Sequence, residues 1–164
     1  MTDATVSQPQ DPLRLWRGVT LPEWLDYNGH MTEHRYLQVF GESSDALYER
    51  LGVDFQRADD GAYYTLETHI IHRAEAKVGT RLWTETEILG FDEKRLHLFH
   101  RLHDDCGRLL ATGEHLAIHV RDSSVSSASE QILARLGVLF DERRSLPAPA
   151  GTGSVLNKRL RFSR

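Results

Sequence analysis

Four long runs of strand-forming residues, separated only by short turn-like segments, occupy most of the chain between residues 62 and 120. The runs are AYYTLETHIIHRAEA (62–76), TRLWTETEILGF (80–91), KRLHLFHRLH (94–103) and RLLATGEHLAIHV (108–120). Their separators, KVG, DE and DDCG, have the composition of hairpin connections. Strands joined in this way pair with their neighbours along the chain, and we therefore expect a four-stranded antiparallel meander.

Helical spacing precedes these strands. Thr32 suits the N-cap of a helix and Gly52 suits its stop. The apolar residues between them share one stripe, which contains Tyr36, Phe40, Leu47 and Leu51. This pattern predicts one long helix with a single buried face.

The order of elements predicts one α+β domain over residues 12–141. A short strand at 14–19 and a terminal helix at 127–140, capped by Ser127 or Ser129, complete the set. A five-stranded antiparallel sheet that curls around one long helix, with a short C-terminal helix added, is the hotdog fold. One helix cannot cover both faces of strands this long, so we expect a second copy to complete the core in a homodimer or homotetramer.

Both ends of the chain have the composition of tails. Residues 1–11 are polar and carry Gln and Pro, and residues 142–164 contain a Pro/Ala/Gly linker followed by the basic segment NKRLRFSR. The first residues lack the basic and apolar regions of an export signal. We assign no role to the basic C-terminal tail.

Composition limits the class of binding partner and the cellular compartment that we expect. With 20 basic and 24 acidic side chains and a net charge of -4, the chain offers no footprint for nucleic acid or for an anionic membrane. No run of about 18 apolar residues is present in the sequence to span a bilayer. A single cysteine, Cys106, favours a reducing cytoplasm, where its thiol is buried or incidental. We expect a small-molecule partner.

The segment DYNGHMTE, residues 26–33, places three polar side chains just before the long helix. Asp26 could attack a carbonyl or activate a water, and Asn28 and His30 could orient that water or the carboxylate. The alternative is structural, with Asp26 and Asn28 forming an Asx turn and His30 packing as a polar residue. The combined spacing favours a catalytic segment.

The start of the helix adds a second chemical element to this segment. Its free N–H groups and partial positive charge suit an oxygen that becomes negative during the reaction, and the expected donors lie near Thr32 and Glu33. Gly29 allows a close approach of the backbone to the substrate, or a positive φ. Such an arrangement is suited to hydrolysis of an acyl thioester.

The pattern Asp-x-x-Gly followed by an aromatic-rich helix resembles the 4-hydroxybenzoyl-CoA thioesterase group of hotdog enzymes, which implies that Asp26 is catalytic. The longer spacing Asp-x-Asn-x-His is also similar to plant acyl-ACP thioesterases, in which these residues act with a Glu on a following strand. Glu75, in HRAEAKVG, is the best match to that Glu, with Glu67 and Glu33 as rivals. Glu33 is a rival because its helical phase places it on the buried side of the helix start.

A narrower resemblance covers about residues 16 to 140. The segments EWLDYNGHMTEHRYLQVFGESSDAL, YYTLETHIIHRAEAKVGTRL and EILGFDEKRLHLFHRLH resemble the thioesterase domain fused to some L-carnitine dehydrogenases, and its free-standing relatives. This resemblance implies hydrolysis of betainyl-CoA to betaine and CoA in carnitine breakdown. The chain has no Gly-x-Gly-x-x-Gly dinucleotide fingerprint, which favours the standalone form.

A quaternary ammonium acyl group is held by aromatic faces. Six aromatic side chains are available for this role, namely Trp24, Tyr27, Tyr36, Tyr63, Tyr64 and Trp83, and the first two flank the catalytic segment. Glu67, His69 and Arg73 form a polar row on one strand face that could line the substrate channel, contact a second subunit or simply pair with one another. Basic residues Arg73, Lys77 and Arg95 could meet CoA phosphates.

Other functions are less well supported. His97 and His103 share a strand face but lie too far apart along it to bind one metal ion, and we expect no metal. We also expect no cofactor, because coenzyme A enters as part of the substrate. A thioesterase for another short or aromatic acyl-CoA remains an alternative, and so does a hotdog protein that binds such ligands without turnover. A hotdog dehydratase would leave the Asp-x-Asn-x-His segment without a role.

Overall fold

The computed structural model describes residues 11–152 of the chain. The predicted tail at 1–11 therefore lies almost entirely outside the described residues, and so does the basic end of the predicted tail at 142–164.

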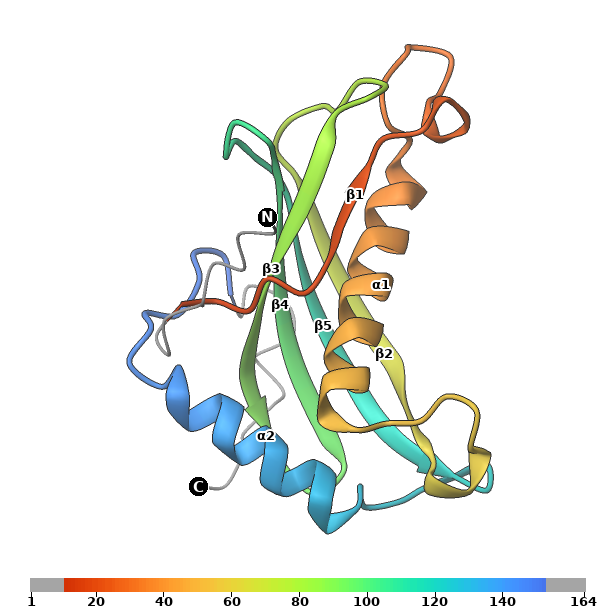
Figure 1. The fold of residues 1–164 in the computed structure, drawn as a ribbon, viewed down its shortest axis with the longest axis vertical. Helices are drawn as coiled ribbons and strands as arrows, with labels where there is room; N and C mark the ends of the chain where they lie inside the picture. Colours follow the sequence, from red (N-terminus) through yellow and green to blue (C-terminus); the bar gives the residue numbers. More distant parts are fainter. Residues whose placement is uncertain (1–10, 153–164) are drawn as a thin grey trace, which may run out of the picture.

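A curled antiparallel sheet packs against one long helix, as the hotdog prediction requires (Figure 1). The sheet order is β1-β3-β4-β5-β2, and a short β6 pairs with β5. In chain order the elements are β1 (Arg17–Val19), α1 (Glu33–Leu51), β2 (Ala62–His72), β3 (Arg81–Phe91), β4 (Arg95–Asp104), β5 (Leu109–Arg121), β6 (Ser124–Val125) and α2 (Glu130–Glu142), with 3-10 turns at Pro22–Trp24 and Ala58–Asp60.

The predicted four-stranded meander is wrong at its first connection. β3, β4 and β5 do pair in sequence, but β2 pairs with β5 at the opposite edge from β1, with Tyr63 opposite His119. The KVG segment is therefore part of a crossover that returns the chain from one side of the sheet to the other. Its backbone is held by other loops, because the Met31 N–H donates to the Ala76 carbonyl at 2.8 Å and the Gly79 N–H donates to the Thr20 carbonyl at 2.8 Å.

The apolar stripe of α1 is buried as predicted. Phe40, Leu47 and Leu51 are each fully buried, and the helix ends at Gly52 with a φ of +91°. A second buried cluster forms around the first half of α1 and includes Trp24, Met31, Tyr36, Phe40 and Leu102. Ser129 caps α2 by accepting a hydrogen bond from the Ile132 N–H at 3.3 Å, which confirms one of the two predicted caps.

A layer of buried polar side chains lies between α1 and the sheet. The His100 ring on β4 contacts two hydroxyls, with Nε2 at 2.9 Å from Ser44 Oγ and Nδ1 at 2.9 Å from Thr86 Oγ1. His115 on β5 contacts Thr68 Oγ1 through Nδ1 at 3.1 Å. The two imidazole rings lie 5.1 Å apart between centroids. Burial of these two rings disfavours their protonated forms.

Within the described residues, neither helix combines the length and the apolar character that a membrane span needs.

Candidate active site at the start of helix α1

The segment 24–32 forms a closed loop at the N-terminal end of α1, at the top of Figure 1. Leu25 and Met31 form an isolated antiparallel bridge, and the Thr32 N–H donates to the Trp24 carbonyl at 2.9 Å. Inside this bridge the Gly29 N–H donates to the Asp26 carbonyl at 3.0 Å, and Gly29 has a φ of +77° that favours glycine. The glycine therefore closes the turn that presents Asp26.

The Asp26 carboxylate is fixed by its own turn. Its Oδ1 accepts a hydrogen bond from the Asn28 N–H at 2.8 Å, and the His30 N–H lies 3.5 Å from the same oxygen. The Asn28 amide nitrogen is 3.4 Å from Oδ2. The Asn28 N–H bond holds the pKa of the Asp26 carboxyl below its ordinary value, with a smaller contribution from His30. Asp26 is thus an oriented carboxylate at neutral pH that still has room to accept a ligand or a water.

His30 and Glu75 meet beside this loop. The His30 Nε2 lies 3.0 Å from Glu75 Oε2, although 45 residues separate them in the sequence. The Met31 N–H bond to the Ala76 carbonyl holds the two segments together. Glu75 lies in the β2–β3 connection rather than on a strand, because β2 ends at His72. The structure therefore brings together Asp26, Asn28, His30 and Glu75, the residues expected to be catalytic.

The helix start differs from the expectation in two ways. The Thr32 N–H is already bonded to the Trp24 carbonyl, so it is not a donor for a substrate oxygen. Thr32 occupies the N-cap, but its side chain makes no capping bond and lies 3.4 Å from His34 Nδ1. Glu33 is exposed, contrary to its expected place on the buried side, because Tyr36 is the first buried residue of the helix.

Two backbone donors remain available at this end of α1. The Glu33 and His34 N–H groups belong to the first helical turn, which has no carbonyl acceptors of its own helix, and they have no acceptor among the described residues. The partial positive charge of the helix terminus adds to their effect. This turn can stabilise a substrate oxyanion, with donors one residue later than expected.

The three aromatic residues proposed for substrate binding fall into two groups. Trp24 and Tyr36 are buried, and each already has a partner, because Arg35 lies 5.6 Å over the Trp24 ring and the Tyr36 hydroxyl donates to the Ala74 carbonyl at 3.3 Å. Tyr27 is 97% exposed and adjoins Asp26 in the chain. Of the three, Tyr27 is the one whose ring is free to contact a ligand.

The polar row expected on β2 is not part of this loop. The side chains of Thr68 and Ile70 pack on the face of β2 towards α1. Glu67 and His69 alternate with them along the strand, so their side chains lie on the opposite face. Arg73 lies beyond the end of β2 and next to Glu75. The structure therefore brings Arg73 to the site. Among the described residues, neither Glu67 nor His69 contacts Asp26.

The described residues contain one group of three side chains with potential metal ligands close together, Asp104, Asp105 and Cys106. The Asp104 carboxylate is already satisfied, because Oδ1 accepts from the Cys106 and Arg108 N–H groups and Oδ2 accepts from Arg108 Nε. Cys106 is a free, exposed thiol rather than a buried one. The Asp104 carboxylate therefore acts as a structural acceptor in the β4–β5 turn.

The sequence patterns did not predict one residue of this site, Arg108. Arg108, just before β5, donates from Nη2 to the Glu75 carbonyl at 3.1 Å and so links the β4–β5 turn to the candidate site. Its position in a turn after DDCG gave no functional signal. An alternating pattern within a strand could not have revealed it, because the contact depends on the crossover that places 73–80 beside this turn.

The fold and the loop match a known class of protein. Residues 20–147 match the family model described as the thioesterase-like superfamily, and the chain belongs to this family. A particular set of relatives stands out within it. The chain is 47% identical over 146 residues to the L-carnitine dehydrogenase/betainyl-CoA thioesterase of Rhizobium meliloti (strain 1021), covering 87% of this chain but only 29% of that protein. It is 40% identical over 141 residues to the betainyl-CoA thioesterase of Pseudomonas aeruginosa PAO1, covering 83% of this chain and 89% of that one.

Solved structures agree on the fold. A candidate thioesterase from Pseudomonas putida KT2440 is 32% identical, with a TM-score of 0.79 and coverage of 93% of this chain and 98% of that one. A protein from Staphylococcus aureus solved in complex with CoA has a TM-score of 0.80 at 22% identity, with coverage of 87% and 94%. The second likeness shows a shared fold.

Proposed function

We propose that this chain is an acyl-CoA thioesterase whose favoured substrate is betainyl-CoA, which it hydrolyses to betaine and CoA. The observation that carries the proposal is the Asp26 carboxylate, held by the Asn28 N–H at 2.8 Å in a loop where His30 meets Glu75 at 3.0 Å. A family member 40% identical to this chain, and similar to it over nearly its whole length, is a betainyl-CoA thioesterase. We further propose that the chain needs no cofactor and acts in the cytoplasm, where a free, exposed Cys106 is stable.

In the proposed reaction Asp26 acts as a general base or as the nucleophile. As a base it takes a proton from water, and the water oxygen attacks the thioester carbonyl carbon. As the nucleophile it attacks that carbon itself, and water then hydrolyses the resulting anhydride. In both cases the carbonyl oxygen becomes negative beside the Glu33 and His34 N–H groups, and the C–S bond breaks to release the CoA thiolate. In the general-base route the thiolate takes the proton held by Asp26, and in the nucleophilic route it takes the proton released when water hydrolyses the anhydride. His30, held by Glu75, positions water or the carboxylate.

The acyl specificity rests on charge and aromatic surface. A betainyl group carries a trimethylammonium cation, which binds to aromatic faces and near carboxylates. Tyr27 offers an exposed ring directly beside Asp26. Tyr64 is 59% exposed near the start of β2, at the opposite end of that strand from Glu75, so it would offer a second ring only from another copy of the chain.

A panel of thioesters tests the proposed function. We expect the wild-type protein to release free CoA thiol from betainyl-CoA with a higher kcat/KM than from acetyl-CoA, a medium-chain acyl-CoA or 4-hydroxybenzoyl-CoA. Preference for another ester would retain the thioesterase and reject the betainyl substrate. If none of the four is hydrolysed while CoA still binds, the protein is a ligand-binding hotdog protein without turnover.

We also propose that two or four copies associate, beginning at the edge of β2. Within residues 11–152 this eleven-residue strand has one neighbour, β5, and it exposes Tyr64 at 59% and Leu66 at 56%. Exposed edges of this length pair readily with another strand. Antiparallel pairing of two β2 strands places the start of one beside the end of the other, so that Tyr64 of one copy lies towards Glu75 of the other.

Sedimentation velocity checks this association. We expect a mass of two or four times the 18.8 kDa chain at micromolar concentration. Leu66→Lys should shift the protein towards the single-chain mass, whereas Val138→Lys, at an equally exposed site on α2, should not. A wild-type protein that sediments as one chain would contradict the proposal.

A further inference from the structure

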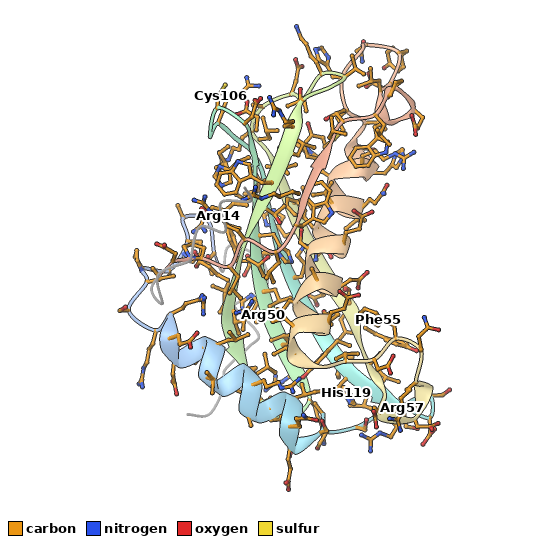
Figure 2. The ribbon with its side chains drawn as sticks, in the orientation of Figure 1. Arg14, Arg50, Phe55, Arg57, Cys106 and His119 are labelled. Atoms are coloured by element: carbon orange, nitrogen blue, oxygen red, sulfur yellow. The ribbon has the colours of Figure 1, made fainter. Side chains whose placement is uncertain are left out.

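A cleft of about 780 Å³ opens beside the candidate catalytic residues. One wall is the β2–β3 connection, with Arg73, Glu75 and Lys77, and the other is the β4–β5 turn, with Asp105 and Arg108. Figure 2 shows Cys106 of this turn at the end of the molecule that holds the start of α1, whereas Arg50, Phe55 and Arg57 lie towards the other end. Because Glu75 also holds His30, the cleft and the catalytic loop share a wall.

The acidic groups of this cleft are already paired. Glu75 meets His30 at 3.0 Å, and Asp104 accepts hydrogen bonds from Arg108 and from two backbone N–H groups. Asp105 lies 3.7 Å from Arg81 Nε.

Two basic side chains of the same cleft have no such partner. Arg73 and Lys77 are exposed, and no carboxylate among the described residues lies within ion-pairing distance of either one. The cleft therefore has uncompensated positive charge at its β2–β3 wall. The third basic residue named from the sequence, Arg95, is at the β3–β4 turn and pairs with Asp92 at 2.6 Å.

We propose that Arg73 and Lys77, with the nearby Arg108, bind the phosphate groups of the CoA part of the substrate. The inference rests on the proposed function, because CoA is the leaving group of that reaction. Guanidinium and ammonium groups are the usual protein ligands of phosphate, and the planar fork of Arg73 can bind two phosphate oxygens at once. The phosphates are joined to the thioester by the long pantetheine arm, so a cationic cleft that begins next to the catalytic loop lies along the path of the arm.

The cleft also orients a betainyl thioester. Its acyl end is a cation and its nucleotide end is a multiple anion, so the two ends prefer opposite surroundings. The unpaired charges of Arg73 and Lys77 attract the nucleotide end and repel the trimethylammonium group, which is left to the side of Asp26 and Tyr27. The positive charges of Arg73 and Lys77 lie on one side of Glu75 and the Asp26 carboxylate lies on the other. This arrangement selects the direction in which the substrate enters.

The test compares two variants with the same loss of charge. In the first, Arg73→Gln and Lys77→Gln are combined; in the second, Arg17→Gln and Arg50→Gln remove two exposed basic groups outside the cleft. By calorimetry we expect the cleft variant to bind CoA at least about tenfold more weakly than the wild type, and the control variant to bind CoA nearly as the wild type does. Equal CoA affinity in the two variants overturns the proposal.

Kinetics add a readout that a merely structural change would not give. For the cleft variant we expect KM for the acyl-CoA to rise about tenfold, with kcat little changed and with KM for the matching acyl-pantetheine thioester unchanged, since that substrate lacks the nucleotide. A rise in KM for both substrates would overturn the assignment of phosphate binding. If the wild type hydrolyses no thioester, the proposed function fails, and the CoA calorimetry still decides the phosphate site.

Discussion

Between pH 7.5 and pH 5 the protein is expected to lose about 2 kcal/mol of folding free energy through His115 alone. Burial lowers the pKa of His115 to about 4, and burial together with the neighbouring His115 lowers the pKa of His100 well below its ordinary value. The unfolded chain has ordinary histidines, which take up protons near pH 6.5. Below that pH the unfolded state binds protons that the folded state does not bind. The free energy of unfolding therefore falls with falling pH until His115 itself titrates near pH 4.

The surroundings of His100 and His115 explain why these rings stay unprotonated in the folded state. The side chains against the two rings are Ser44 and Phe40 from α1, Thr86 from β3 and Thr68 from β2, none of which carries a charge. His115 Nε2 has no hydrogen-bond partner among the described residues. A proton on either ring would place a positive charge in the layer between the helix and the sheet with no anion to compensate it.

Urea unfolding at pH 7.5 and pH 5 measures this effect. His115→Gln keeps a polar group near Thr68 and removes the titration, so we expect the drop in free energy between the two pH values to shrink by about 2 kcal/mol. His34→Gln, which removes an exposed histidine of α1, should leave the drop unchanged. His119, whose pKa burial also lowers, accounts for part of the dependence that remains. An identical drop in the wild type and His115→Gln would contradict this account.

The local parts of the fold follow from the sequence because short-range physics determines them. The stripe of α1 and its stop at Gly52 depend on spacing along one helix, and Gly52 provides the φ of +91° that ends it. The turn of Asp26, Asn28 and Gly29 likewise depends on three neighbouring residues. The structural role of an Asx turn and the chemical role proposed for Asp26 are compatible, since the turn uses Oδ1 to hold the carboxylate in place.

The same local patterns do not predict which strands distant in the sequence pair with each other. Turn composition predicts a connection near KVG, but the strand ends earlier, at His72, and the composition does not predict the partner of β2. The pairing of β2 with β5 joins residues as far apart as Tyr63 and His119. The contact of His30 with Glu75 was expected only through resemblance to other thioesterases, because the crossover that produces it has no local signature. The exposure of Glu33 was missed since the buried stripe of α1 begins at Tyr36.

The histidines of β4 show how strand phase separates roles. His97 contacts Glu114 at 2.8 Å on one face of the sheet, whereas His100 lies on the other face against Ser44. Strand alternation alone assigns opposite faces to positions 97 and 100, but only the packing of α1 shows that His100 is fully buried.

Replacing Asp26 by Asn should lower kcat by about 10²–10⁴-fold, the usual loss when a general base is removed. Asn keeps an oxygen that can accept the Asn28 N–H bond now made at 2.8 Å, so the turn and the fold should survive. The amide cannot take a proton from water and is a poor nucleophile, so the chemical step is lost while KM stays near that of the wild type.

Asp92→Asn is the matched control. The Asp92 Oδ1 also accepts backbone hydrogen bonds in a turn, from Lys94 at 2.9 Å and Arg95 at 2.6 Å, but it lies between β3 and β4, away from the candidate catalytic loop. Its substitution tests whether the same chemical change in another turn affects turnover. We expect a kcat within about twofold of the wild type, together with some loss of stability from the weakened pair with Arg95.

The kcat of Asp26→Asn on betainyl-CoA, measured beside the wild type and Asp92→Asn after circular dichroism has shown all three to be folded, tests the catalytic role of the loop most directly. We predict a loss of at least about a hundredfold for Asp26→Asn alone. A folded Asp26→Asn protein that releases CoA within about threefold of the wild-type rate would contradict the assignment of this loop as the active site.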